Sequence, residues 1–149
     1  MKITSRAFQD KGDIPESYTC MGEDVSPPLE FSDVPEGTES LALIVEDHDA
    51  PNGDFVHWII WDIDPKTVEK IDEGSTPVGA VEGTTDFQRT GYGGPCPPSG
   101  KHKYEFHIYA LNSKLDLPAG SDKNSFRRAL EGKVIEEAVL IGMYQKPQE

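Results

Sequence analysis

The stretch that decides the fold is Ser40-Leu41-Ala42-Leu43-Ile44-Val45-Glu46, followed after a short loop by Phe55-Val56-His57-Trp58-Ile59-Ile60-Trp61-Asp62-Ile63. Both runs have the length of a strand, are rich in Val, Ile and Trp, and carry apolar residues at successive positions. Apolar side chains on both faces are typical of a strand that is covered on both sides. We therefore expect two central strands in a buried sheet.

The rest of the chain adds more strands and one clear helix. Residues 102–111 alternate with a period of two, so that His102 and Tyr104 share a face with an apolar row, while His107 lies on the opposite face. A helix is expected after Ser121 or Asp122, then a shorter helical turn over 134–137 and a last strand over 139–144. Because strands dominate and do not alternate with helices, the pattern favours a mainly β, mostly antiparallel fold.

Length and charge limit the function. At 149 residues without a linker or repeat, the chain is expected to form one domain, 1–149. Its 27 acidic and 14 basic residues give a net charge of -13, which disfavours nucleic acid and anionic lipid as partners. No apolar run is long enough to span a bilayer, so we expect a soluble, cytoplasmic protein without stable membrane insertion, in which Cys20 and Cys96 are free thiols.

Two segments carry the residues expected to form a site. Asp47-His48-Asp49-Ala50-Pro51 ends the first apolar run and leads back to His57, which would bring Asp47 close to that imidazole. The second segment has glycines at 91, 93, 94 and 100 and ends at His102, at the start of a strand. Unshielded backbone N–H groups beside one or two imidazoles suit a phosphate or a carboxylate. His57 or His102 taken alone is more often a hydrogen-bonded structural residue than a ligand-binding one, and His107 is expected to be structural.

The same segments resemble signatures of the phosphatidylethanolamine-binding protein family. Asp47 to Pro51, followed by His57-Trp58, is similar to its Asp-Pro-Asp-Ala-Pro motif and His-Trp pair. Gly94 to Pro98 and His102-Lys103-Tyr104 resemble its Gly-x-Pro-Pro loop and His-Arg-Tyr strand start, in the form of the bacterial and archaeal branch. Ser26-Pro27-Pro28-Leu29 and the tail 138–144 extend the likeness over nearly the whole chain.

The resemblance implies a large antiparallel β-sheet with a smaller sheet packed beside it, few peripheral helices, and an anion pocket at one end. It also implies a cis Ala50-Pro51 peptide and, by analogy, the possibility of a homodimer. Carried onto this sequence, the residues that would bind the ligand are Asp47, Ala50, Pro51, His57, Gly94, Cys96, Pro97, His102 and Tyr104.

The chain departs from the family pattern at several positions. His48 stands where the family usually has proline, which places a titratable group between two acids, and Lys103 replaces arginine, which removes a planar fork of donors. The loop between Pro51 and His57 is short, so an aromatic pocket wall from this loop is not assumed. These departures weaken the inference of lipid-headgroup recognition most.

Three functions compete. The first is a non-enzymatic binding protein for a small phosphorylated or carboxylated group, without a cofactor or metal. The second is an inhibitor that contacts a protein kinase or a serine peptidase. The third is an enzyme in which Cys96 is the nucleophile, His102 the base and Asp47 its orienting partner. We favour the first and keep the second as the alternative. The third is weakened because flanking prolines keep Cys96 away from a helix N-terminus that would activate its thiol. A metal site built from His48, His57 and His102 is not favoured, because their spacing is not that of zinc ligands.

Overall fold

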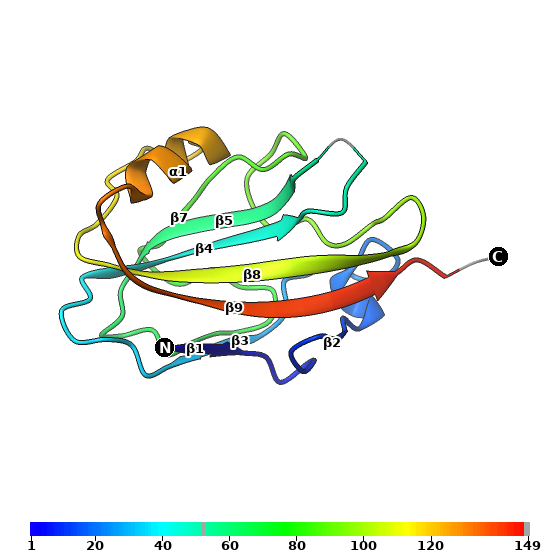
Figure 1. Cartoon of the computed structure of the whole chain (residues 1–149), viewed down its shortest axis with the longest axis horizontal. Coiled ribbons are helices and arrows are strands. Elements are labelled where there is room, and N and C mark those ends of the chain that lie inside the picture. The colour runs from blue at the N-terminus through cyan, green and yellow to red at the C-terminus, as the bar shows by residue number, and fades with distance from the viewer. Residues whose placement is uncertain (52, 148–149) are drawn as a thin grey trace.

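The two apolar runs form neighbouring antiparallel strands, β4 (Ser40–Asp47) and β5 (Phe55–Ile63). The computed structural model describes residues 1–51 and 53–147. Every residue of β4 is buried, and β5 is buried from Val56 to Trp61, as expected for strands that are covered on both faces. Figure 1 shows both strands in the middle of the larger sheet.

The larger sheet has six strands in the order β2-β9-β8-β4-β5-β7. Strand β8 (Lys101–Leu111) pairs antiparallel with β4 on one side and with β9 (Val134–Gln145) on the other. The edges are formed by β2 (Gly12–Asp13), which is parallel to β9, and β7 (Val81–Glu82). The helical turn expected over 134–137 is wrong, because pairing with β8 makes these residues the start of β9.

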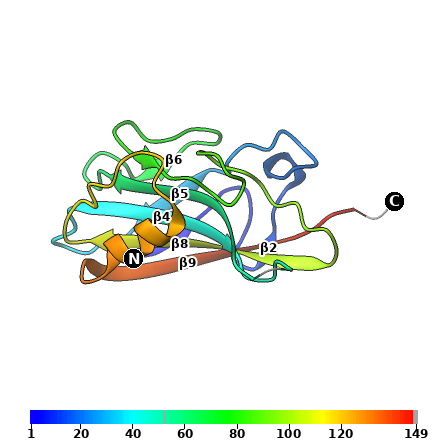
Figure 2. The same ribbon diagram turned by 90° about the horizontal axis from the view of Figure 1, so that it is seen from above.

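A smaller sheet packs on one face of the larger one, and a helix packs on the other. The smaller sheet has the order β1-β3-β6 and comprises β1 (Lys2–Thr4), β3 (Leu29–Ser32) and β6 (Lys70–Ile71). One core joins the two sheets and includes Phe31, Val45 and Phe106, while a second core lies under the helix and includes Ile44 and Phe126. In Figure 2, β5 and β4 lie between β6 and the helix.

The helix is α1 (Lys123–Leu130), and it begins as the sequence predicts. The side chain of Asp122 caps it by accepting a hydrogen bond from the backbone N–H of Ser125, at 2.9 Å. A short 3-10 helix covers Glu16–Tyr18. The mainly β fold with two sheets and a peripheral helix is therefore confirmed. Within residues 1–51 and 53–147, no helix has the length and apolar character needed to cross a membrane.

Candidate functional site

A cavity of about 260 Å³ opens where β4 ends and where β5 and β8 begin. In Figure 1, these strand ends meet at the right-hand side of the larger sheet. The cavity is lined by Asp47, Ala50, Pro51, Gly53, Asp54, Phe55, His57, Phe87, Cys96, Pro97, Pro98, His102 and Tyr104. The structure thus brings together every residue predicted to bind a ligand except Gly94, and their role in binding stays a prediction.

Strand register and a β-bulge bring four polar side chains to the wall of this cavity. Asp47 is paired with Tyr104 across β4 and β8, and His102 lies two residues before Tyr104 on the same face. On β5 the register shifts, because Val45 pairs with Trp58 whereas Glu46 pairs with Val56. His57 is the extra residue of the resulting β-bulge, a feature that commonly re-aims a side chain beside a site.

Asp47 holds the imidazole of His102, not that of His57. Nδ1 of His102 lies 2.6 Å from Oδ2 of Asp47, and both side chains are buried. A carboxylate oxygen accepts, so Nδ1 carries the proton of this hydrogen bond. Oδ1 of Asp47 accepts from the backbone N–H of Asp49 at 2.8 Å, which fixes the carboxylate. Nε2 is therefore the ring nitrogen of His102 that Asp47 does not engage.

His57 is anchored through the same ring nitrogen. Its Nδ1 donates to the backbone carbonyl of Gly93, at 2.7 Å. Burial lowers the pKa of His57, although the hydrogen bond to Gly93 and the charge of Asp47 act in the opposite direction. In the unliganded protein His57 is therefore neutral near pH 7, with Nε2 as an acceptor.

The hydroxyl of Tyr104 is buried and has no hydrogen-bond partner in the described part of the chain. The Tyr104 ring lies 5.2 Å from the ring of His57 and 6.4 Å from that of His102, measured between centroids. Burial, and then the charges of Asp47 and Asp49, raise the pKa of this hydroxyl far above its ordinary value. It therefore stays protonated and can donate a hydrogen bond.

Two phenylalanines form an aromatic wall that the sequence analysis did not predict. The rings of Phe55 and Phe87 are 4.9 Å apart, and each lies close to the ring of His57, at 5.1 and 5.2 Å. Phe55 could have been found as the first residue of the β5 run, but Phe87 lies in a loop without a recognisable signal. Among the described residues that line the cavity there is no lysine or arginine, so positive charge has to come from imidazole.

The expectation of free thiols is wrong. Cys20 and Cys96 form a disulfide, with their Cα atoms 5.5 Å apart, across a sequence separation of 76 residues. The backbone supports this approach, because the N–H of Cys20 donates to the carbonyl of Pro95 at 3.1 Å. Free thiols were expected because the protein was assigned to a reducing compartment. The fold, however, brings the loops that carry Cys20 and Cys96 into contact.

Two further expectations about the loops are corrected. No peptide in the described residues is cis, so the Ala50-Pro51 bond is trans. Gly94 does not offer its N–H to a ligand, because that group donates to Oδ1 of Asp24 at 2.7 Å. A Cβ at Gly94 would lie 2.3 Å from the carbonyl oxygen of Tyr18, so glycine is required here for close packing and not for an anion cradle.

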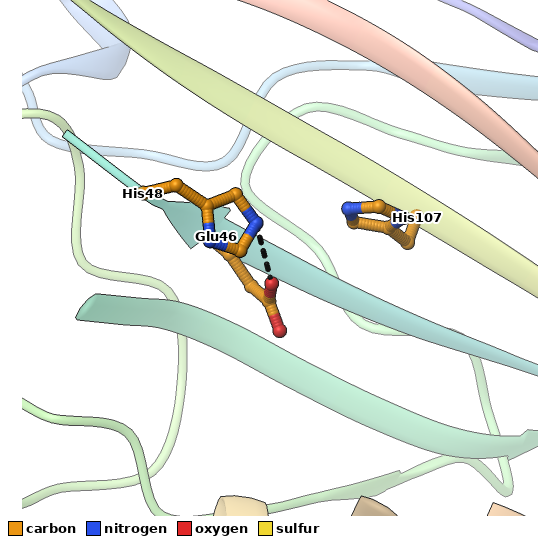
Figure 3. Close-up of side chains that lie close together, drawn as sticks. All are labelled: Glu46, His48 and His107. Atoms are coloured by element: carbon orange, nitrogen blue, oxygen red, sulfur yellow. Dashed lines mark ion pairs between the residues drawn. The ribbon is translucent and has the colours of Figure 1, made fainter. Parts of the chain in front are cut away.

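A second polar cluster lies on the helix-bearing face of the larger sheet. Glu46, His48 and His107 place one potential metal-binding atom each within 4.8 Å of the others. Figure 3 shows Glu46 and His48 on the β4 side, with His107 opposite them on β8. The grouping rejected from the sequence, His48 with His57 and His102, is split between the two faces of the sheet.

Comparison with known proteins gives a consistent result. Residues 4–145 match the family model described as phosphatidylethanolamine-binding protein. A UPF0098 protein of Methanothermobacter thermautotrophicus is 47% identical, over 98% of this chain and 99% of its own, and one of Aquifex aeolicus is 43% identical, over 98% and 89%.

Solved structures agree in fold as well as in sequence. The PEBP homologue CT736 of Chlamydia trachomatis has a TM-score of 0.93 and 41% identity, covering 98% of this chain and 97% of its own. E. coli YbcL, described as a member of the mammalian PEBP family, has a TM-score of 0.91 and 31% identity, covering 98% of both chains. With its two sheets, its cavity at the strand ends and its match over residues 4–145, the chain belongs to the phosphatidylethanolamine-binding protein family.

Proposed function

We propose that this protein is a non-enzymatic binding protein whose cavity takes a small anion: inorganic phosphate, a phosphomonoester headgroup or a carboxylate. The observation that carries the proposal is the buried, unpartnered hydroxyl of Tyr104 beside two anchored imidazoles. A buried donor without a partner is costly, and a ligand oxygen would satisfy it. The volume of about 260 Å³ lies below the range of roughly 300–1,000 Å³ that is usual for drug-sized ligands.

The charges of the residues that line the cavity favour weak binding of an anion together with a proton. Asp47 and Asp54 contribute negative charge to the cavity, and an anion is tolerated only when a neighbouring imidazole is protonated or the anion itself carries a proton. Because Nδ1 is engaged in both His57 and His102, the acquired proton would lie on Nε2. Phe55 and Phe87 exclude water from one side of the site, which strengthens such contacts.

The two competing functions have less support. The Cys96 thiol needed for covalent catalysis is tied up in the disulfide with Cys20. Inhibition of a kinase or a peptidase would be recognised by co-purification of a partner or by loss of activity in an enzyme panel, whereas a ligand binder responds to the anion alone.

The first prediction is direct binding of phosphate or phosphoethanolamine, with a dissociation constant on the order of tens of micromolar to millimolar, because so small a ligand makes few contacts. Titration followed by amide and imidazole NMR should move the signals of His57, His102 and Tyr104. His57→Gln and His102→Gln should each weaken binding by about tenfold. His107→Gln, a matched change on the opposite face of β8, should leave affinity unchanged. Shifts confined to other surfaces would refute the site.

The second prediction concerns pH, and sulfate is the better probe because it stays dianionic throughout the range. Burial lowers the pKa of His57 in the free protein, and a bound dianion raises it again, so binding takes up a proton. Affinity should therefore rise as pH falls from about 8 to about 5.5, by up to about tenfold per pH unit. The charges of Asp47 and Asp24 act on this ring, and His102 and Tyr104 share the cavity with it. Calorimetry in buffers of different ionisation heat counts the protons, and a flat profile would contradict the prediction.

A further inference from the structure

The cluster of Glu46, His48 and His107, on the face of the larger sheet that carries α1, has the residue types and the spacing of a transition-metal site. Glu46 lies near the end of β4, His48 follows that strand directly, and His107 projects from β8, on the face that also carries α1. Register explains the meeting, because Ile44 is paired with His107 and Glu46 with Glu105 across the two strands. The cavity residue Asp47, by contrast, points to the opposite face.

The two imidazoles are oriented in the same way. Nδ1 of His48 lies 2.5 Å from Oδ1 of Asp54, and Nδ1 of His107 lies 3.1 Å from Oε1 of Glu137. Each carboxylate accepts from Nδ1, which leaves Nε2 of each ring as a lone-pair donor when the ring is neutral. A carboxylate that bonds the far nitrogen of a metal-binding histidine is the usual outer-shell arrangement, and it fixes the tautomer and the ring orientation.

Both Nε2 atoms face carboxylates, in an ion pair at His48 and without a hydrogen bond at His107. Nε2 of His48 lies 3.0 Å from Oε2 of Glu46. Nε2 of His107 is buried and makes no hydrogen bond within the described part of the chain, although Oε1 of Glu105 is 3.2 Å away. Glu105 also lies 3.5 Å from Nε2 of His48, through its Oε2 atom. One donor atom each from Glu46, His48 and His107 therefore lies within 4.8 Å of the others, and Glu105 borders both imidazoles.

The donor set selects the class of metal. Zinc bonds to His nitrogen and Glu oxygen at about 2.0–2.2 Å in a tetrahedron, which requires donors about 3.3–3.5 Å apart. The present separations, 3.0 Å for one pair and at most 4.8 Å for the others in the three-residue group, lie on either side of that requirement, so that small side-chain movements would close the site on the metal. Two imidazoles with one or two carboxylates suit Zn²⁺ and similar first-row ions, whereas Ca²⁺ and Mg²⁺ prefer oxygen alone.

We propose that Glu46, His48 and His107 form a binding site for Zn²⁺ or a similar divalent transition metal, with Glu105 or a water molecule in the fourth position. The guanidinium of Arg127 on α1 pairs with Oε1 of Glu46 and holds that carboxylate in place, leaving Oε2 for the metal.

A proton on His48 is the competing occupant. Burial lowers the pKa of His48, but the hydrogen bond to Asp54 and the charges of Glu105 and Glu46 outweigh burial and raise it. Because the metal and the proton compete for Nε2, metal titrations should be made at several pH values, and affinity should rise with pH.

The test is a calorimetric titration of the chelator-treated protein with ZnCl₂. We expect one Zn²⁺ per chain with a dissociation constant on the order of micromolar or tighter. His48→Gln and His107→Gln should each weaken binding by at least about tenfold, and Asp54→Asn by a similar or smaller factor. His57→Gln, the matched control in the cavity, should bind as the unchanged protein does. Equal affinity in all these variants, or a loss confined to His57→Gln, would overturn the proposal.

Two measurements on the unchanged protein avoid any effect of substitution on folding. Long-range ¹H–¹⁵N NMR should show Zn²⁺ shifting Nε2 of His48 and His107 while Nδ1 keeps its proton. Co²⁺ should give the visible absorption of a four-coordinate site, and Ca²⁺ should not compete with it. Binding in which Ca²⁺ displaces Co²⁺, or in which neither imidazole shifts, would mean that the metal merely associates with the acidic surface.

Discussion

Loss of the Cys20–Cys96 disulfide should lower the free energy of unfolding by about 4 kcal/mol, a large part of the stability of a domain of this size. The bridge closes a loop with a sequence separation of 76 residues, and a cross-link over so long a loop restricts the unfolded chain strongly. Urea unfolding of the Cys20→Ser/Cys96→Ser variant against the oxidised protein measures the difference. Dithiothreitol should produce a similar loss in the unchanged protein.

The same bridge has a second consequence, because Cys96 lines the cavity. Its loop is also held to the segment around Tyr18 by three hydrogen bonds. Tyr92 Oη donates to the Tyr18 carbonyl at 2.7 Å, the Gly94 N–H donates to Asp24 at 2.7 Å, and the Cys20 N–H donates to the Pro95 carbonyl at 3.1 Å. These contacts should preserve the cavity, so that reduction lowers stability more than it lowers anion affinity. Cys20→Ser is the informative single change, because it opens the bridge without altering the cavity wall. Two titratable thiols in the unreduced, unfolded protein would show that the disulfide does not form.

The central strands and the helix could be predicted because their signals are local. The β5 run has the bounds expected, and β4 and β8 each differ by one residue. The segment 134–137 could not be read in this way, because its conformation is set by pairing with β8 over the length of β9. A partner strand that is distant in the sequence overrides a weak local preference.

Most residues that line the candidate site could be predicted from the sequence, but not which of them are hydrogen-bonded to one another. Alternation along β8 correctly places His102 and Tyr104 on one face, whereas the partner of Asp47 depends on the register between β4 and β8. The bulge at His57 likewise has no signal in one sequence, because it arises from a mismatch between two strands. The grouping of Glu46 with His107 required the same register, and this is why His107 was expected to be only structural.

Tyr104→Phe should weaken phosphate binding by about tenfold or more while leaving the free protein as stable as before or more stable, by about 1 kcal/mol. The hydroxyl is buried without a partner in the described structure, so its removal relieves an unsatisfied donor and leaves the ring packed between His57 and His102. In the complex, however, the hydroxyl would donate to a charged oxygen, and hydrogen bonds to charged groups are the strong ones.

Tyr144→Phe is the matched control for that change. Its hydroxyl is also buried and unpartnered in the described structure, but Tyr144 does not line the cavity. Both variants should therefore match or exceed the unchanged protein in urea unfolding, and only Tyr104→Phe should lose affinity in the NMR titration. If Tyr104→Phe destabilised the free protein by more than about 1 kcal/mol, the hydroxyl would have a structural partner. If it bound phosphate as tightly as Tyr144→Phe does, the hydroxyl would not face the anion. Removal of the Tyr104 hydroxyl should therefore raise stability and lower phosphate affinity. This combination is expected when a binding site keeps an unsatisfied donor at a cost in stability.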